Sequence, residues 1–162
     1  MLLIEDKEFL KEDYTNIQLE KAEYDNCTFT NCNFENANLS GIVFTQCIFI
    51  GCNMGNANIN HTAIKECDFR ECKLLGLQFS SCEQFLFSAS FNHCYMELTS
   101  FYKMKLKSTK FTNCVLAEAD FTEADLTAAS FTECDLKNAV FDRTVLEKAD
   151  LRTAYNLSLI HI

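Results

Sequence analysis

Ten cysteines are the residues of this 162-residue sequence best suited to chemistry, because a thiolate can bind a metal ion or attack a substrate. Nine of them occupy one position of a five-residue pattern, as Cys27 and Cys32 do, and alternate there with alanine. Zinc sites instead need paired ligands that close a tetrahedron. We therefore interpret the nine as small buried packing residues and predict no metal site and no cofactor. Cys82 lies where the pattern is interrupted and is the one candidate reactive thiol.

The three histidines, His61, His93 and His161, share no spacing with each other or with a nucleophile. The sequence contains no Ser/His/Asp or Cys/His arrangement, no carboxylate pair suited to a cleft and no glycine-rich phosphate loop. We therefore predict no catalytic residues and expect that the protein is not an enzyme.

The composition and charge limit the cellular compartment and the class of partner that we expect. The chain carries 14 basic and 23 acidic residues, a formal charge of −9, whereas binding to a nucleic-acid backbone requires a basic excess. The amino terminus becomes acidic after three apolar residues, unlike a secretory signal, and no apolar run approaches the length of a membrane span. We expect a cytoplasmic protein with reduced thiols, no direct nucleic-acid contact and no membrane association.

The elements that position these residues follow from a repeat of five. Apolar residues recur at every fifth position from Leu19 to Phe79 and, after a slip of two residues, from Leu86 to Leu151, which makes 27 apolar centres. A period of five fits neither the 3.6 residues of a helical turn nor the two-residue alternation of a flat strand. It fits a short extended side followed by a corner, with the centre and the residue two before it pointing inward.

A second period sets the number of sides. Cysteines recur at intervals of twenty, as in Cys27, Cys47 and Cys67, so one coil holds four repeats and has four sides. Coils that stack at strand spacing lie about 4.8 Å apart. The 27 repeats therefore predict a rod of about seven coils.

Two stretches, residues 119–123 and 124–128, read Ala-Asp-Phe-Thr-Glu and Ala-Asp-Leu-Thr-Ala. On this pattern the sequence from about residue 17 to residue 155 resembles the pentapeptide repeat family, whose consensus is A-(D/N)-(L/F)-x-x. The resemblance implies an all-β fold, a right-handed quadrilateral parallel β-helix (a solenoid). It extends to the bacterial Qnr and MfpA branch of acidic cytosolic rods, which bind type II topoisomerases and modulate quinolone action as DNA mimics.

We expect three regions along the chain. Residues 1–16 form an N-terminal capping segment, in which Phe9 and Tyr14 continue the apolar frame as an irregular first coil. Residues 17–155 form the β-helix, with the two-residue slip at 80–85 making a bulged corner or small loop. Residues 156–162 resemble a translated sequencing adapter more than a repeat, and we interpret them as a non-native tail.

The corners are expected to differ between the two halves. Asn or Gly often follows the centre by two residues up to Phe79, where a type II turn needs a positive φ. Charged residues such as Glu118 and Glu123 hold this position in the second half. We therefore predict mostly type II corners before residue 79 and other turns, without positive φ, after it.

Acidic residues are concentrated late in the chain, with nine acids and three bases between residues 117 and 150. They form either a solvated surface or an anionic face for a DNA-binding protein. Opposite charges are also expected to stack, with Lys105 beside Asp125 and with Lys103, Glu123 and Arg143 in one column. The candidate partner-binding acids are Glu118, Asp120, Glu123, Asp125, Glu133 and Asp135.

Four aromatic residues near the slip occupy nominally outward positions and are further candidates for partner contact. They are Phe85, Phe87, Tyr95 and Tyr102. The alternative is that they pack over the bulge.

The most specific functional prediction is a non-catalytic protein-binding module, an acidic DNA mimic that binds DNA gyrase or topoisomerase IV, as the resemblance implies. The alternative is a structural or scaffolding repeat protein with another partner. A redox or metal protein that uses the cysteine columns is a third and weaker hypothesis. A homodimer through an element missing from the C-terminus is also expected from the family.

Overall fold

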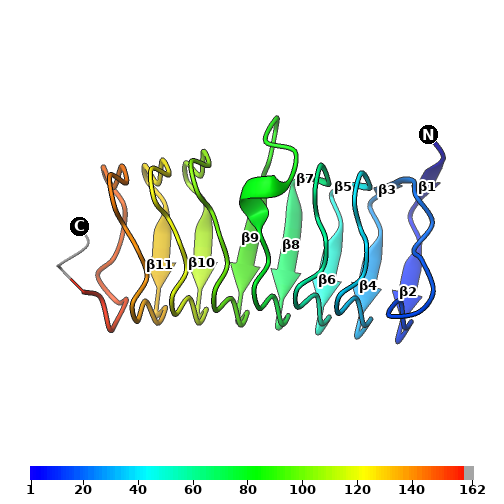
Figure 1. Ribbon diagram of the computed structural model, residues 1–162, viewed down its shortest axis with the longest axis horizontal. Helices are drawn as coiled ribbons and strands as arrows, with labels where there is room; N and C mark the ends of the chain where they lie inside the picture. The colour runs from blue at the N-terminus through cyan, green and yellow to red at the C-terminus, as the bar shows by residue number, and fades with distance from the viewer. Residues whose placement is uncertain (159–162) are drawn as a thin grey trace.

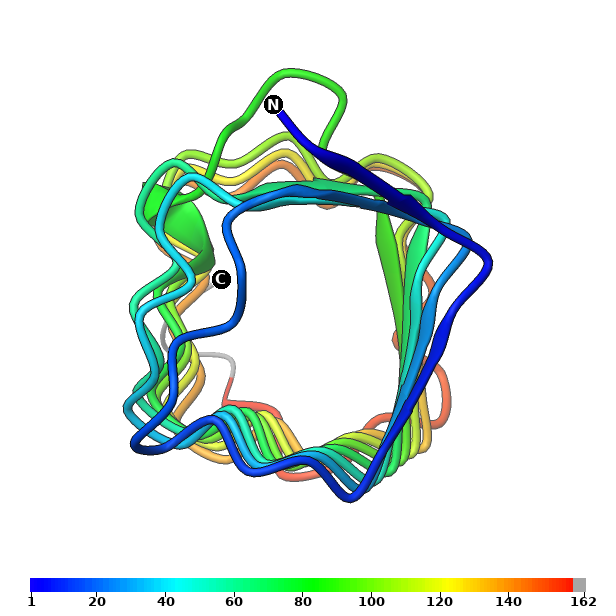
Figure 2. The same cartoon turned by 90° about the vertical axis from the view of Figure 1, so that its right-hand side faces the viewer.

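The repeat of five residues builds a coil with four sides, one side for each repeat (Figure 2). The computed structural model describes residues 1–158, over which the coils stack into a straight rod (Figure 1). Two parallel sheets form two of its sides, with strand orders β1-β3-β5-β7 and β11-β10-β9-β8-β6-β4-β2. The predicted all-β quadrilateral β-helix is confirmed. The seven strands of the longer sheet have six turns between them, close to the expected seven coils.

The strands are short because each side has only five residues. In chain order they are β1 (Leu3–Glu5), β2 (Glu8–Leu10), β3 (Glu23–Asp25), β4 (Thr28–Thr30), β5 (Val43–Thr45), β6 (Ile48–Ile50), β7 (Ala63–Lys65), β8 (Cys67–Arg70), β9 (Ala89–Asn92), β10 (Lys110–Thr112) and β11 (Ser130–Thr132). One 3₁₀ turn, η1 (Phe79–Ser81), precedes β9.

Aromatic rings fill the interior of the rod. The centres of the seven-stranded side stack from Phe9 to Phe131, with ring centroids 4.6 to 5.3 Å apart. A second stack runs from Phe79 to Phe141 at 4.9 to 5.2 Å. Rings of the two stacks meet edge to face, a favourable arrangement of their quadrupoles. Because side chains occupy the interior, function has to reside on the outer surface.

Corner geometry differs from our expectation. The angle φ is positive at Asn31 and Asn36 (+53° and +57°) and equally at Glu118 and Glu123 (+59° and +57°). The prediction that the second half lacks positive φ is therefore wrong. Each side must turn into the next within five residues, and a left-handed residue makes this turn in both halves. The cost to a non-glycine residue, about 1–2 kcal/mol, is outweighed by hydrogen bonds between coils.

The slip of two residues forms a loop, residues 82–88, which projects from the rod between η1 and β9 (Figures 1 and 2). Across it the register changes from twenty residues to twenty-two, with Phe69 opposite Phe91. Both ends of the loop are tied to the preceding coil. Glu83 N donates to the carbonyl of Thr62 at 2.8 Å, and Ser88 N donates to that of Ile64 at 3.0 Å.

Two side chains of this loop have the opposite exposure to that which the repeat predicts. Leu86, expected as an inward centre, is 62% exposed. Phe87, expected to point outward, is half-buried and meets Phe79 edge to face at 6.1 Å. The two extra residues free the loop from the inter-coil register, so the larger ring takes the inward place. The amide of Gln84 fixes the turn by donating to the carbonyls of Phe79 and Cys82, at 3.2 and 2.8 Å.

The two ends of the rod can be compared with the predicted capping segment and the predicted tail. Residues 1–16 contain β1 and β2, which pair at the twenty-residue register, with Leu3 opposite Glu23 and Phe9 opposite Phe29. Up to Asp13, which bridges Asn33, this segment pairs in the regular register of the coils, and its capping role stays a prediction. Within the expected tail, residues 159–162 lie outside the described residues.

Candidate functional site

The six candidate acids lie in pairs at corners of the rod. One member of each pair follows a centre by two residues, and the other precedes the next centre. The pairs Glu118/Asp120, Glu123/Asp125 and Glu133/Asp135 therefore occupy three different corners. The structure brings together the members of each pair but not the three pairs, so the six carboxylates do not share one face.

Three of these acids complete their own corner. Asp125 Oδ1 accepts hydrogen bonds from the backbone N and from Oγ1 of Thr127, at 3.0 and 2.6 Å, and these bonds lower the pKa of Asp125. Asp120 and Asp135 accept in the same way from the backbone two residues on, at 2.9 and 3.1 Å. Asparagines make the same contact in the first half: Asn33, Asn38, Asn53 and Asn58. An acceptor at this position therefore serves the fold.

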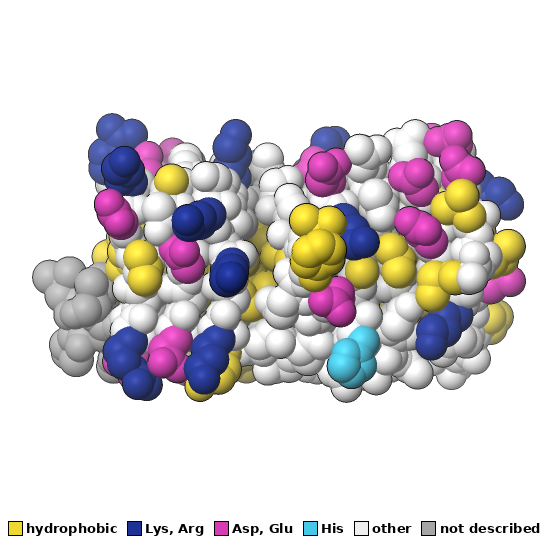
Figure 3. Space-filling view, turned by 90° about the horizontal axis from the view of Figure 1, so that it is seen from above, with side chains coloured by type: hydrophobic (Ala, Val, Ile, Leu, Met, Phe, Trp, Pro, Cys, Tyr) yellow, Lys and Arg dark blue, Asp and Glu magenta, His cyan; other side chains and the backbone are white. Residues whose placement is uncertain are grey.

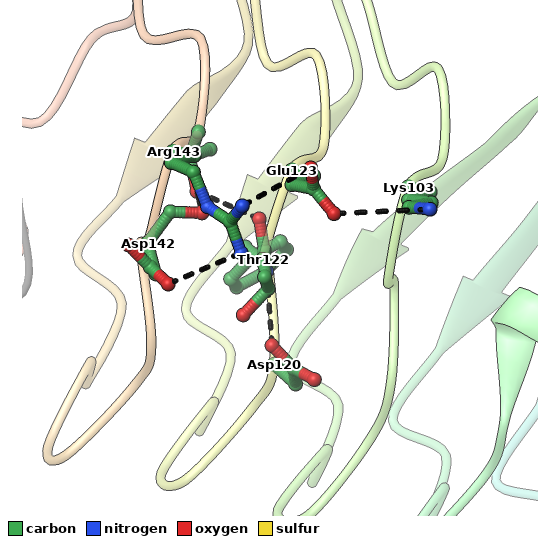
Figure 4. Close-up of polar contacts among 8 residues, drawn as sticks. Lys103, Asp120, Thr122, Glu123, Asp142 and Arg143 are labelled. Atoms are coloured by element: carbon green, nitrogen blue, oxygen red, sulfur yellow. Dashed lines mark hydrogen bonds and ion pairs between the residues drawn. The ribbon is translucent and has the colours of Figure 1, made fainter.

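Glu123 lies between two cations from the neighbouring coils (Figure 4). Its carboxylate oxygens are 3.9 Å from Lys103 Nζ and 3.7 Å from Arg143 Nη1. Arg143 also lies 3.7 Å from Asp142. The predicted column of alternating charge is thus confirmed. Lysine and arginine interrupt the negative charge here, which favours a scaffold over an imitation of the DNA backbone on this part of the surface.

The four candidate aromatic residues are not gathered at one place. Phe85 projects from the loop and is 72% exposed, whereas Phe87 packs inward. Tyr95 belongs to a different side of the rod, outside both sheets. Tyr102 lies at a corner, with Lys103 Nζ 5.2 Å from the centroid of its ring.

The nine cysteines of the repeat are buried and contribute hydrogen bonds as well as volume. The thiol of Cys47 donates to the carbonyl of Tyr24 at 3.2 Å, and that of Cys52 donates to the carbonyl of Phe29 at 3.2 Å. Thr62 occupies the equivalent position and donates to the carbonyl of Leu39 at 2.8 Å. The sequence interpretation as mere spacers missed this donor role, although a threonine at the equivalent position of another repeat could have indicated it.

The register across the loop joins two cysteine series into one column. Because Phe69 lies opposite Phe91, Cys72 lies beside Cys94. The column of six runs through Cys32, Cys52, Cys72, Cys94, Cys114 and Cys134. Hydrogen bonds to the neighbouring thiols, together with burial, raise the pKa of Cys72. Cys72 is therefore a protonated donor rather than a nucleophile.

Cys82 was the candidate reactive thiol, and the structure contradicts this. Its side chain is 5% exposed, and burial raises its pKa to about 12. The described residues 1–158 also contain no group of three cysteine, histidine or acidic side chains that could hold a metal ion. Within the same residues, no helix has the length and apolar character needed to cross a membrane.

One side of the rod carries the loop and combines charged and exposed apolar side chains. The sequence did not indicate this surface. We call it the loop face: β1, β3, β5 and β7 form its first part, the loop its middle, and the bridge Lys105–Asp125 belongs to its last part. Acidic side chains lie over the N-terminal coils, an apolar knob stands near the centre, and lysine or arginine mixed with acids lies beyond it (Figure 3).

Two hollows flank the loop. The hollow on its C-terminal side measures about 360 Å³ and is lined by Gln84, Phe85, Leu86, Lys103 and Lys105. The hollow on its N-terminal side measures about 470 Å³ and is lined by Thr45, Gln46, Lys65, Glu66, Leu86, Phe87 and Ser88. The exposed tip of the loop, Phe85 and Leu86, therefore forms a ridge between two depressions.

Comparison with known families identifies the repeat. The sequence profile described as the pentapeptide repeat region matches residues 22–84 and 85–155, two segments that meet within the loop. The chain belongs to the pentapeptide repeat family. The sequence has no significant match among curated proteins.

Solved structures of other pentapeptide repeat proteins resemble this one in fold. HetL, from the cyanobacterium Nostoc sp. strain PCC 7120 and involved in heterocyst differentiation regulation, is 16% identical, with a TM-score of 0.48 over 94% of this chain and 88% of its own. Full-length QnrB1, a plasmid-mediated fluoroquinolone resistance protein, is 22% identical, with a TM-score of 0.47 over 95% and 94%. Rfr23 from Cyanothece 51142 is 12% identical, with a TM-score of 0.32 over 94% and 86%.

Proposed function

We propose that this pentapeptide repeat protein is a non-catalytic protein-binding module that acts as a cytoplasmic scaffold through the outside of its rod. The loop face is the observation that carries the proposal. There, Phe85 and Leu86 are exposed on a loop tied to the rod, and solvent-exposed apolar side chains held together in this way are typical of contact sites. Stacked rings fill the interior, so a partner has to bind outside.

Site-specific photo-crosslinking tests this proposal. A photoreactive phenylalanine analogue placed at Phe85 should trap a specific protein partner in the native host. The same analogue at Thr132, an exposed residue on the seven-stranded side, is the matched control. Adducts that are absent at both positions, or identical at both, would contradict binding through the loop face.

A second candidate function is binding to DNA gyrase or topoisomerase IV as an acidic DNA mimic. It is favoured by four acids with no basic residue at the equivalent position of either neighbouring coil: Glu118, Asp120, Glu133 and Asp135. Asp120, for example, lies between Ser100 and Val140. Uncompensated carboxylates at intervals along a rod could occupy a surface that accepts phosphates.

A gyrase supercoiling assay, with and without a quinolone, tests this second function. The wild-type protein should alter supercoiling or protect the enzyme at micromolar concentration, and E118Q/D120N/E133Q/D135N should lose that effect. Asparagine keeps the acceptor that completes each corner, so the variant removes charge with little change to the fold. The control E8Q/E12Q/E20Q/E35Q removes the same charge near the other end. Wild-type protein without effect would exclude the topoisomerase function.

A further inference from the structure

We infer that the loop face is the contact surface of an antiparallel homodimer, in which it packs against the loop face of a second copy. The starting observation is that charge is segregated along the rod. Residues 1–40 carry nine acids and three bases, whereas residues 41–116 carry five acids and seven bases. An acidic and a basic region of one rod can therefore complement those of another.

Both regions have members on the loop face. Glu23 and Asp25 flank the centre of β3, and Lys105 and Lys107 flank Leu106 on the far side of the loop. Among the described residues, none of these four side chains has an ion pair within 4.0 Å or a side-chain hydrogen bond. Two carboxylates and two ammonium groups thus stand on the same face without a close ion pair in their own chain, although Lys105 and Lys107 act electrostatically on Asp125 of the next coil.

Their spacing is symmetric about β7. Strand β3 lies two strands from β7 on one side, and Lys105 lies two coils from β7 on the other, across the loop. Each group is therefore about 10 Å from β7 at strand spacing. A two-fold axis parallel to β7, between two facing copies, places Glu23 and Asp25 of each copy opposite Lys105 and Lys107 of the other.

The same axis also matches the shapes of the two faces. The loop lies one coil beyond β7, so the loop of the second copy falls over β5, one strand before β7. The larger hollow extends from the end of β5, at Thr45 and Gln46, past Lys65 and Glu66 at the end of β7 to the loop. Phe85 and Leu86 of each copy can therefore enter the hollow of the other and lose their exposure to water.

The contact is small, and this sets its strength. Four coil spacings from β3 to Lys105 span about 19 Å. A contact of this length buries less area than the roughly 800 Å² per partner of a standard interface. We therefore expect a weak, concentration-dependent dimer that is strengthened at low salt, because exposed charges are screened beyond about one Debye length.

Sedimentation equilibrium of the full chain between about 10 and 500 μM, at low and high salt, tests the inference. The variants K105E/K107E and E23K/D25K each place like charges opposite each other, and each should weaken self-association by about tenfold or more. An equimolar mixture of the two should associate again, because the like-charged contacts at positions 23, 25, 105 and 107 then become opposite-charged ones. The control K110E/K137E carries the same charge change on two other sides of the rod and should dimerise as the wild type does.

Removing the knob provides a second, uncharged test. F85S/L86S should weaken association, while circular dichroism stays that of the wild type because both side chains are exposed. A wild-type chain that remains monomeric at 500 μM and low salt would overturn the inference. So would a mixture of the two charge variants that stays monomeric, or charge variants that dimerise like the wild type.

Discussion

Replacing Phe111 by alanine tests whether stacked rings are the main source of stability in this rod. Phe111 is fully buried, with its ring centroid 5.2 Å from that of Phe91 and 4.9 Å from that of Phe131. It also meets Phe101 and Phe121 edge to face, at 5.8 and 6.0 Å. The substitution therefore removes four aromatic contacts and leaves a cavity the size of a ring.

The expected cost follows from these contacts. Loss of a buried phenylalanine costs about 3–5 kcal/mol, and the cost is greatest where the neighbours cannot collapse. Strand pairing from β10 to β9 and to β11 keeps the coils at their spacing, so the cavity stays open. We expect a loss of about 4 kcal/mol or more in the free energy of unfolding.

Urea unfolding followed by circular dichroism measures this loss, with hydrogen exchange alongside because repeat proteins can unfold in segments. Phe85→Ala is the exposed control and should change stability by no more than about 0.5 kcal/mol. Phe9→Ala should fall between the two, because Phe9 is half-buried and contacts two rings rather than four, Phe29 at 4.6 Å and Tyr24 at 5.9 Å. A loss below about 1 kcal/mol at Phe111, or an equal loss at Phe9, would refute the reasoning.

Four further predictions follow from the corners and thiols. Cys52→Ala should lower the free energy of unfolding by about 1 kcal/mol and Cys52→Thr by less, as measured in urea, because a hydroxyl can keep the bond to the carbonyl of Phe29. Iodoacetamide at pH 8 should label Cys82 far more slowly in the native protein than in the urea-unfolded chain, because the buried thiol has a pKa of about 12. The lowered pKa of Asp125 stabilises the fold above its unfolded value of about 3.9, and this stability is lost as the pH falls through the folded value; acid titration of Asp125→Asn should lack that component. Glu118→Gly should leave the thermal midpoint unchanged or raise it, because glycine adopts the positive φ of this corner without strain.

The fold could be predicted from the sequence because every repeat places its apolar residues at the same spacing. The spacing of five placed residues such as Phe29 and Phe111 inside, and the spacing of twenty gave the register that pairs Phe111 with Phe131. The corners could not be predicted from residue type. Asparagine favours a positive φ and glutamate does not, yet both adopt it, because the turn is imposed by the inter-coil hydrogen bonds rather than by local preference.

The candidate site was predicted less well, and for a different reason. The acids were located at the correct positions of the repeat, and the period of twenty already implies that Glu118, Glu123 and Glu133 occupy three different corners. Within the loop no register applies, so the exchange of Leu86 and Phe87 depends on local packing against Phe79. Lys105, Lys107 and the loop tip become one surface only when the coils are stacked.

The position of the loop explains why specificity should be concentrated on one side of this rod. In a coil of the solenoid, each outward residue is fixed between neighbours twenty residues before and after it, and its backbone is used in pairing on both sides. An insertion is tolerated only where the register can resume, as it does from Phe69 to Phe91. The inserted segment is freed from pairing, so it can expose Phe85 and Leu86 without removing an inward centre from the core. The regular repeat cannot generate an exposed apolar loop tip of this kind. The tip therefore lies at the break in the repeat, between an acidic and a basic region of the same face.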